Sequence, residues 1–345
     1  MTSKLANVQT LAIRCPNWVG DVVMATPVFE CLRRNLPKAR IVGVMKKSAK
    51  GIVRDAPWFD DVVDADDKTW AGFRRMRAQL RALSPDAAIV LTNSIRSALT
   101  LRLSGIRRLY GYRRQGRNLL LAGGPSASHN GTMVPIPMGQ YYLEICRWLG
   151  LDIPERPRPA LFVGPDLQKR ADSLLARYGV ADSDFLIGLN PGASFGSSKC
   201  WPPEYFAELA RLCQKAFKAK IILFSGPGEE GIIEDILGRA QVEMIDSRVD
   251  LEMLKPLVKR CNLFITNDTG PRHYAVAFDV PTVVIIGSTD PRYTAANLEH
   301  TAVVRKELDC SPCHKRICPG QHECMRQIRP TEVLAAAQRL VTTPG

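Results

Sequence analysis

The alternation of short apolar runs with amphipathic stretches constrains the fold of this chain more than any single residue does. Residues 10–15 and 39–45 are apolar runs of strand length, and residues 22–36 between them carry apolar side chains at helical spacing. A strand, a helix and a second strand in this order form a unit with parallel strands and a crossover helix. The same alternation continues to the C-terminus, so the sequence predicts an α/β protein with parallel sheets covered by helices.

A proline-rich passage interrupts this alternation. Residues 153–160 have the sequence IPERPRPA, and their prolines exclude helix and favour an extended connection. The length of 345 residues also exceeds the usual size of one domain. We therefore predict two doubly wound, Rossmann-like domains, residues 1–160 and 161–330, with ligands bound beyond the carboxyl ends of the strands.

The chain is strongly basic. Lysine and arginine number 47 against 34 aspartate and glutamate residues, a net charge of +13, which indicates an anionic partner such as nucleic acid, acidic lipid or a phosphorylated substrate. Arginines concentrate between Arg96 and Arg117, but aromatic residues make up only 7% of the chain and no aromatic-basic ladder for stacking bases is present. This argues against nucleic acid. A solvated basic helix face is the alternative explanation of the charge.

Neither a membrane span nor an export signal is found in the sequence. No apolar run approaches the roughly 20 residues that a spanning helix requires, and the N-terminus lacks a cationic start followed by an apolar core. We expect a cytoplasmic protein with reduced thiols. Four of its ten cysteines cluster with His314 and His322 in one segment, at Cys310, Cys313, Cys318 and Cys324. They could hold a structural zinc ion, although the spacing differs from common zinc-finger patterns, and metal-free thiols are the alternative.

Four loops that follow predicted strands carry more polar or small residues than a connection requires. In the first, residues 16–21, Asp21 either caps the following helix or serves as a base, and Gly20 would let a substrate approach the backbone beside it. In the second, Lys199 follows small and hydroxyl residues that suit a phosphate or diphosphate, namely Gly192, Ser194, Gly196, Ser197 and Ser198. The second loop does not match the P-loop pattern, so nucleoside triphosphate hydrolysis is not indicated.

The third loop, Gly226–Gly231, formally matches the dinucleotide-binding pattern G-x-G-x-x-G, and Asp246 lies twenty residues beyond its first glycine. A dehydrogenase would bind the pyrophosphate of NAD(P) at Gly226, Gly228 and Gly231. The acidic side chains of Glu229 and Glu230 disfavour a pyrophosphate at this place. They suit ribose hydroxyls better, or the N-terminus of the next helix.

The fourth loop contains Asn267-Asp268-Thr269-Gly270-Pro271-Arg272-His273. Pro271 favours a helix start here, which places Thr269 and the N–H of Gly270 at the positive end of the helix. That end can receive an anion, and His273, one turn further, could add a donor. The alternative is that Asp268 or Thr269 only caps the helix.

Together these motifs resemble the lipopolysaccharide heptosyltransferases, family 9 of the GT-B glycosyltransferases. The resemblance spans nearly the whole chain and depends on the order of PNWVGDVVMATP, NSIRSAL, GYRRQGRNLLL, NPGASFGSSKCWPPEYFAELA and NDTGPRHYAVAFDVPTVVIIGSTDP. It implies two Rossmann-like domains facing a central cleft, an N-terminal one for the acceptor and a C-terminal one for the nucleotide sugar. It also implies that a last helix, within residues 331–345, packs back on the N-terminal domain.

The resemblance further implies inverting transfer of L-glycero-D-manno-heptose from ADP-heptose to the first heptose of the lipopolysaccharide inner core, with no catalytic metal or cofactor. Asp21 would be the general base and Lys199 would stabilise the departing ADP. The donor would contact Gly20, Ser194, Ser197, Ser198, Gly228, Glu229, Asp268, Thr269, Gly270 and His273. The acceptor would contact Asn17, Arg96, Arg113, Arg114 and Arg117. The expected partners are therefore the nucleotide sugar and the inner-core acceptor at the inner membrane surface, without nucleic acid.

Two rival hypotheses follow from single motifs. The Gly226–Gly231 loop alone would indicate an NAD(P)-dependent dehydrogenase. The basic charge together with a zinc-stabilised cysteine cluster would indicate a nucleic-acid-binding protein. Neither hypothesis explains the remaining strand-end loops.

Overall fold

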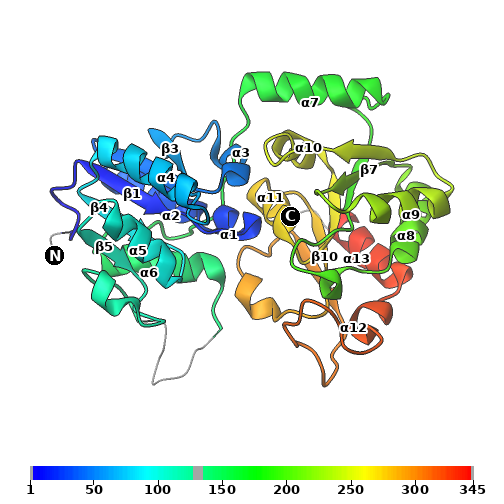
Figure 1. Ribbon diagram of the computed structural model, residues 1–345. Coiled ribbons are helices and arrows are strands. Elements are labelled where there is room, and N and C mark those ends of the chain that lie inside the picture. Colours follow the sequence, from blue (N-terminus) through cyan, green and yellow to red (C-terminus); the bar gives the residue numbers. More distant parts are fainter. Residues whose placement is uncertain (1–2, 127–134, 343–345) are drawn as a thin grey trace. The chain divides into compact units, whose positions relative to one another are not determined.

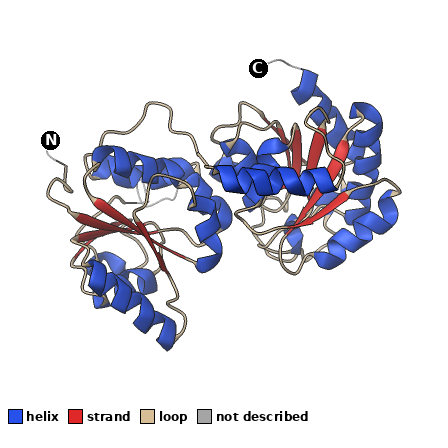
Figure 2. Cartoon of the chain, turned by 90° about the horizontal axis from the view of Figure 1, so that it is seen from above, coloured by secondary structure: helices blue, strands red, loops and turns tan. Residues whose placement is uncertain are grey.

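The computed structural model describes residues 3–126 and 135–342 (Figure 1). The chain divides into two compact units, one formed mainly by residues 1–162 and the other mainly by residues 163–345. The division lies just after the proline-rich passage 153–160. Each unit contains one sheet, and Figure 2 shows helices on both sides of each sheet.

The first unit is built on a five-stranded parallel sheet with the order β3-β2-β1-β4-β5. Its strands are β1 (Thr10–Arg14), β2 (Arg40–Met45), β3 (Asp61–Asp64), β4 (Ala87–Val90) and β5 (Arg108–Gly111). Its helical segments are α1 (Val19–Met24), α2 (Thr26–Asn35), η1 (Lys47–Ala49), α3 (Lys50–Val53), α4 (Trp70–Leu83), α5 (Ile95–Leu103), η2 (Arg117–Leu120) and α6 (Met138–Trp148). Strand β4 is fully buried and β1 is buried except at Thr10, as is typical of central strands in a parallel sheet.

The helix expected at residues 22–36 is two helices in the structure. Helix α1 ends at Met24 and α2 begins at Thr26, with Pro27 in its first turn. Proline lacks an N–H and its ring excludes the preceding helical turn, so it is accommodated at a helix start and not in a helix interior. Helix α1 also begins earlier than predicted, which places Asp21 in its first turn.

The second unit is built on a six-stranded parallel sheet with the order β11-β10-β9-β6-β7-β8. Its strands are β6 (Leu186–Asn190), β7 (Lys220–Ser225), β8 (Ile245–Arg248), β9 (Leu263–Asn267), β10 (Thr282–Ile286) and β11 (Thr301–Arg305). Its helical segments are α7 (Pro165–Arg177), η3 (Ser197–Lys199), α8 (Pro203–Phe217), α9 (Glu230–Ala240), α10 (Leu254–Arg260), α11 (Gly270–Ala277), η4 (Pro291–Thr294), α12 (Glu323–Arg326) and α13 (Pro330–Thr342).

The last helix, α13, packs within the second unit. It contacts α8, β10 and β11 of that unit, and the expected packing of residues 331–345 on the N-terminal domain stays a prediction. Val333, Ala336 and Ala337 are buried in the hydrophobic core of this unit, in the same cluster as Trp201 and Phe206. The apolar face of α13 is thus used within its own unit. Residues 343–345 of the expected segment lie outside the described part of the chain.

Both sheets have a topological switch point, where consecutive connections leave in opposite directions. In the first unit β1 lies between β2 and β4, and in the second unit β6 lies between β7 and β9. In open parallel sheets, ligands bind beyond the carboxyl ends of the strands at such a point. The loops that follow β1 and β4, and those that follow β6 and β9, are therefore the places for functional groups.

Candidate active site

In the second unit, one ion pair joins the two loops at the switch point. Lys199, in η3 after β6, extends its ammonium group to Asp268, which directly follows β9. The Nζ atom of Lys199 lies 2.9 Å from Oδ2 of Asp268 and 2.7 Å from its backbone carbonyl oxygen. Both side chains are largely buried. The sequence predicted both residues, and the structure brings them together.

Asp268 is the centre of a larger network. Its Oδ1 accepts a hydrogen bond from Nη1 of Arg272 at 2.6 Å, and its Oδ2 accepts one from the hydroxyl of Thr289 at 2.6 Å. Burial raises the pKa of this carboxyl, but Arg272 and Lys199 outweigh burial and hold the pKa well below its usual range. Asp268 is therefore ionised at neutral pH, and its two oxygens are used by protein donors. Arg272 and Thr289 were not predicted as functional residues, because nothing in the sequence shows that they meet Asp268.

The N-terminus of α11 lies next to this ion pair. Thr269 is the residue that precedes the helix, and no side chain caps the helix there. The alternative interpretation, in which Asp268 or Thr269 caps the helix, is thus not observed. Gly270 and Pro271 form the first turn, at the positive end of the helix dipole.

His273 is buried in α11. Burial and the neighbouring Arg272 lower its pKa to about 3. The imidazole is consequently neutral at neutral pH and would offer an anion a neutral N–H donor, not a charge.

The hydroxyl residues of the β6 loop differ from one another in exposure. Ser194 and Ser197 are exposed, as a ligand-binding role requires. Ser198 is buried, contacts Oγ of Ser288 at 3.1 Å and donates a hydrogen bond to the carbonyl oxygen of Lys315. We therefore correct the expectation that Ser198 binds the donor: its hydroxyl holds the loop to the segment that contains the cysteine cluster.

Glu229 connects the third loop with the second. Its Oε2 accepts a hydrogen bond from the backbone N–H of Gly226 at 2.7 Å. A side chain at Gly192 would collide with the carboxylate, because a Cβ there would lie 1.9 Å from Oε2. Burial raises the pKa of Glu229. Gly228 is exposed and has a positive φ of 85°, which suits glycine.

In the first unit, Asp21 lies in α1 after β1, at the switch point of that sheet. Its carboxylate is hydrogen-bonded to the buried phenol of Tyr142, from α6. Burial, and then the charge of Asp21, raise the pKa of this phenol well above its usual value, so the phenol is neutral and donates to Asp21. Gly20 precedes Asp21 and is buried. The sequence did not predict the role of Tyr142, which is 121 residues away in the chain.

Arg14, a buried residue at the end of β1, holds the loop before α1 through hydrogen bonds. Its Nη2 donates to Oδ1 of Asn17 at 3.0 Å, and its Nη1 donates to the carbonyl oxygen of Cys15 at 2.7 Å. Asn17 and Trp18 are exposed on the outer side of this loop, and Nζ of Lys46 lies 5.8 Å from the centre of the Trp18 ring. Asn17 is therefore accessible to a ligand.

The four arginines expected to contact an acceptor divide into two groups. Arg96 and Arg113 are exposed and Arg114 is half-buried. Arg117 is fully buried, and its guanidinium donates to the carbonyl oxygens of Tyr112, at 2.9 Å, and Thr92. We correct the expectation for Arg117: it fixes the loop after β5 to the loop after β4 and is not a surface residue.

Asn93, which follows β4 at the switch point, also belongs to this group. Its Oδ1 accepts hydrogen bonds from the hydroxyl of Tyr141 at 2.9 Å and from Nη2 of Arg117 at 3.4 Å. Asn93 is half-buried. The NSIRSAL motif in which it lies was recognised from the sequence, but its amide was not singled out.

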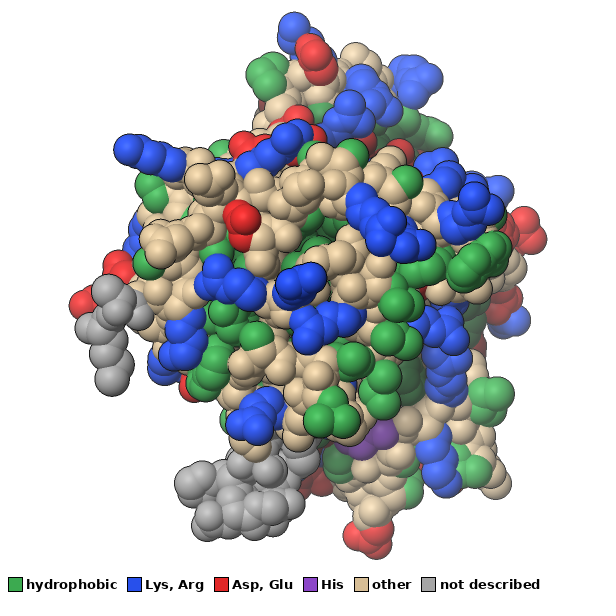
Figure 3. Space-filling view, turned by 60° about the vertical axis from the view of Figure 1, so that its left-hand side comes forward, with side chains coloured by type: hydrophobic (Ala, Val, Ile, Leu, Met, Phe, Trp, Pro, Cys, Tyr) green, Lys and Arg blue, Asp and Glu red, His purple; other side chains and the backbone are tan. Residues whose placement is uncertain are grey.

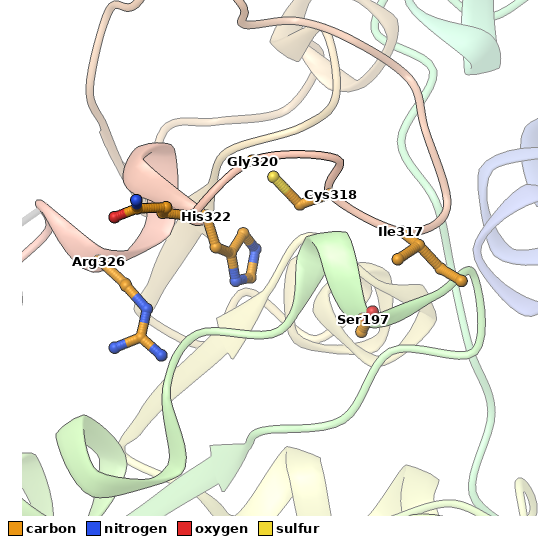
Figure 4. Close-up of a pocket in the computed structure, with 7 residues that line it drawn as sticks. Ser197, Ile317, Cys318, Gly320, His322 and Arg326 are labelled. Atoms are coloured by element: carbon orange, nitrogen blue, oxygen red, sulfur yellow. The ribbon is translucent and has the colours of Figure 1, made fainter.

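The cysteine-rich segment packs directly on the β6 loop. The N–H of Ser198 donates to the carbonyl oxygen of Arg316 at 3.1 Å, and a ring nitrogen of His322 lies 2.9 Å from the carbonyl oxygen of Ser198. A Cβ at Gly196 would lie 2.3 Å from the Arg316 carbonyl oxygen, so this close approach requires glycine. Between the two segments is a hollow of about 430 Å³, lined by Ser197, Ile317, Cys318, Gly320, Gln321, His322 and Arg326 (Figure 4).

The four clustered cysteines differ in exposure. Cys310 is exposed, Cys313 and Cys318 are half-buried, and Cys324 is buried. Within residues 3–126 and 135–342, no three His, Cys, Asp or Glu side chains are arranged so that they could hold a metal ion. Burial raises the pKa of Cys324, and the thiols of the other three cysteines are nevertheless near enough to raise it further. A structural zinc ion at these cysteines stays a prediction. The observed role of the segment is to support the β6 loop.

The fold and these strand-end groups define a class. Two doubly wound parallel sheets, one with a carboxylate and the other with a lysine and a helix N-terminus at its switch point, give this protein the GT-B fold. Residues 73–323 match the model of glycosyltransferase family 9 (heptosyltransferase), and the chain belongs to this family. The predicted fold class and family are confirmed, and the dehydrogenase and nucleic-acid hypotheses have no support.

Individual relatives are distant but match over almost their full length. The lipooligosaccharide heptosyltransferase 2 of Haemophilus ducreyi is 28% identical, with 94% of this chain and 97% of the relative covered. A family 9 glycosyltransferase structure from Veillonella parvula has a TM-score of 0.84 at 22% identity, covering 96% and 97% of the two chains. The structure of ADP-heptose lipopolysaccharide heptosyltransferase II from Escherichia coli has a TM-score of 0.79 at 24% identity, covering 96% and 98%.

Proposed function

We propose that this glycosyltransferase transfers L-glycero-D-manno-heptose from ADP-heptose to the first heptose of the lipopolysaccharide inner core, with inversion and without a catalytic metal. The names of the relatives support this proposal, since several are heptosyltransferases numbered 2 and one is described by its ADP-heptose donor. The motifs quoted from the sequence support the same assignment.

The observation that carries the proposal is the pair formed by Lys199 and Asp268 at the N-terminus of α11. When the glycosidic bond to the diphosphate breaks, negative charge grows on the departing ADP. A fixed ammonium group and the positive end of a helix stabilise such charge best when they are held in place before the reaction. Asp268 holds Lys199 through two hydrogen bonds, so the ammonium group needs no reorganisation.

The donor-binding set follows from this placement. We assign the diphosphate to Lys199, Thr269 and the N–H of Gly270, with Ser194 and Ser197 as exposed hydroxyl donors. His273 would add one neutral N–H. Gly228 and Glu229 lie on the neighbouring β7 loop, where a carboxylate oxygen suits ribose hydroxyls. Asp268 acts on Lys199 and does not face the phosphates, because like charges repel.

On the acceptor side, Asp21 would be the general base. The acceptor hydroxyl attacks the anomeric carbon of the donor, the bond from that carbon to the diphosphate oxygen breaks, and Asp21 takes the hydroxyl proton. Tyr142 holds the carboxylate through its hydrogen bond. Gly20 leaves room beside it.

Asn17, Arg96, Arg113 and Arg114 would bind the carboxylates and phosphates of the inner core at the cytoplasmic surface of the inner membrane. The face drawn in Figure 3 carries many Lys and Arg side chains and few acidic ones. Among residues 3–126 and 135–342, no helix is long and apolar enough to cross a membrane. Any membrane contact of this part of the chain would thus be peripheral.

One experiment tests the function. Purified protein is incubated with ADP-heptose and with an acceptor that carries lipid A, the inner-core sugar acids and one heptose, and ADP release is measured. We expect release only when both substrates are present, and no release from UDP- or GDP-sugars. Release with another nucleotide sugar only, or none with any heptose-bearing acceptor, would contradict the proposal.

A further inference from the structure

Helices α4 and α5 form a layer on one face of the first sheet that contains no acidic residue. The two helices pack against each other, and Met76, Leu80 and Leu101 from their inner sides belong to one core cluster. Neither helix contains Asp or Glu, and residues 87–143 contain none either. Exposed arginines project from this layer at positions 74, 81, 96 and 102, and a further one, Arg75, pairs with Asp66 of the preceding loop at 3.1 Å. The layer is therefore a cationic surface.

The same layer exposes large apolar side chains. Ile95, Leu99 and Leu103 recur every four residues along α5, so they share one side of the helix, and each is at least 42% exposed. Trp70, at the start of α4, is 72% exposed. A helix that only faced water would carry polar side chains at these positions.

The segment η2 extends this surface. It packs against α5, and the side chain of Ile95 lies 3.9 Å from the position of a Cβ at Gly116, directly before η2. Leu119 in η2 is 93% exposed, the highest value of any large apolar side chain in the described ranges. Arg113 is exposed shortly before it.

We infer that the layer of α4, α5 and η2 docks on an anionic lipid bilayer. Arginines on helices without acidic residues are attracted to anionic headgroups, each with a contribution of about 1 kcal/mol near the membrane. Exposed leucine, isoleucine and tryptophan side chains between them gain free energy by entering the boundary between headgroups and acyl chains. Nucleic acid would use the charge but would leave the aliphatic side chains without a partner.

This inference rests on the proposed function only for the location of the acceptor, which is part of a lipid. Docking through α4, α5 and η2 would hold the first unit at the surface in which the acceptor is embedded. Vesicle binding is measured without donor or acceptor, so a failure of heptosyl transfer and a failure of membrane docking can be told apart.

The test is co-sedimentation with vesicles of phosphatidylglycerol and phosphatidylcholine, compared with phosphatidylcholine alone, at about 0.1 M salt. We expect binding to the anionic vesicles only. The variant Arg74→Ala with Arg81→Ala should bind about 30-fold more weakly, and Leu103→Ser with Leu119→Ser about tenfold more weakly. The control Arg170→Ala with Arg177→Ala removes the same charge from exposed positions of α7 in the second unit and should bind normally.

All four proteins, the unaltered one and the three double variants, are checked for native circular dichroism, which these exposed substitutions should preserve. Equal loss in the α7 control would show that overall charge, not this layer, causes binding, and would overturn the inference. So would the absence of vesicle binding by the unaltered protein. Binding of duplex DNA in place of vesicles, with the same dependence on Arg74 and Arg81, would assign the layer to nucleic acid instead.

Discussion

The ammonium nitrogen of Lys199 lies 2.9 Å from Oδ2 of Asp268, and the two residues are separated by 69 positions in the chain. This pair bridges the loops after β6 and β9, the two central strands at the switch point of the second sheet. Asp268 has three further contacts, to Arg272, to Thr289 and through its own carbonyl oxygen to Lys199. It is therefore a positioning residue, and its removal should affect both stability and the reaction.

We predict that Asp268→Asn lowers the free energy of unfolding by about 3–5 kcal/mol, because it leaves the buried charges of Arg272 and Lys199 without their counterion. It should also lower kcat more than it raises KM for the donor, since a misplaced Lys199 loses its effect mainly in the transition state. Urea denaturation and steady-state kinetics measure the two effects.

A matched control for this variant is Asp235→Asn on α9. Asp235 pairs with Arg239 at 2.5 Å, but both side chains are substantially exposed. An exposed pair contributes about 0–1 kcal/mol, so this variant should unfold and react almost as the unaltered protein does. Similar losses in the two variants would contradict the role of Asp268.

His273 should make stability depend on pH. Its pKa is about 3 in the folded protein against a usual value of 6.5, so the unfolded chain binds a proton between these values and the folded protein does not. Stability is then complete above pH 6.5 and falls as the pH decreases, by about 2 kcal/mol between pH 7 and pH 5. Asp268, whose folded pKa is also lowered, adds a loss only below about pH 4.

Denaturation at pH 7 and at pH 5 checks this prediction. His273→Gln should remove most of the difference between the two values, because the titrating group is gone. His300→Gln, a change of the same kind at a half-buried histidine, should leave the difference in place. The prediction fails if both variants keep the full pH dependence.

Arg117 and Arg113 should respond differently to replacement by alanine. Arg117→Ala leaves the carbonyl oxygens of Tyr112 and Thr92 without their buried donor, at a cost of about 3 kcal/mol in unfolding free energy. Arg113→Ala, at an exposed position, should change stability by less than about 0.5 kcal/mol and raise KM for the acceptor. A destabilised Arg113→Ala with unchanged KM would contradict the assignment.

Much of the fold could be predicted from the sequence, because continuous apolar runs such as residues 186–190 and 263–267 are typical of buried parallel strands. The edge strand β11 was missed, since all five of its residues are only half-buried and its sequence has no clear strand pattern. Pro27, a local signal, divides the first predicted helix. The apolar face of α13 shows that the helix packs against another part of the protein, but it does not specify which elements it contacts.

Sequence analysis could propose site residues where one loop contains the whole signal, as at Thr269 and Gly270. It was not predictable where the function of a residue depends on a distant partner. Arg117 and Arg113 lie four positions apart in the same basic segment, yet one is buried against backbone carbonyls and the other is exposed. Ser197 and Ser198 are adjacent, and only the contact of the second with Lys315 separates their roles.

The base proposed in the first unit leads to a direct prediction. Asp21→Asn should reduce kcat by about 100-fold or more, because an amide cannot accept the acceptor's proton. Thermal stabilisation by the donor ADP-heptose should be unchanged, since the proposed donor contacts lie mainly in the second unit. Near-normal turnover of this variant would exclude Asp21 as the base.

Tyr142 should support the reaction without taking part in proton transfer. Tyr142→Phe removes the hydroxyl that is hydrogen-bonded to Asp21, so the carboxylate is oriented less well and kcat should fall about tenfold. Tyr112→Phe is the matched control: it also removes a buried phenol hydroxyl from the first unit, one that donates to the carbonyl oxygen of Tyr141 at 2.6 Å. Both variants should lose about 1 kcal/mol of stability.

Kinetics across pH separate a positioning role of Tyr142 from a purely structural one. If Tyr142 holds Asp21, the variant Tyr142→Phe should shift the acidic limb of the kcat/KM profile, because the hydrogen bond acts on the base itself. Tyr112→Phe should leave that limb where it is in the unaltered protein. An equal fall of kcat in both variants, with no shift in either profile, would show that the phenol of Tyr142 serves only the packing of α6 against α1.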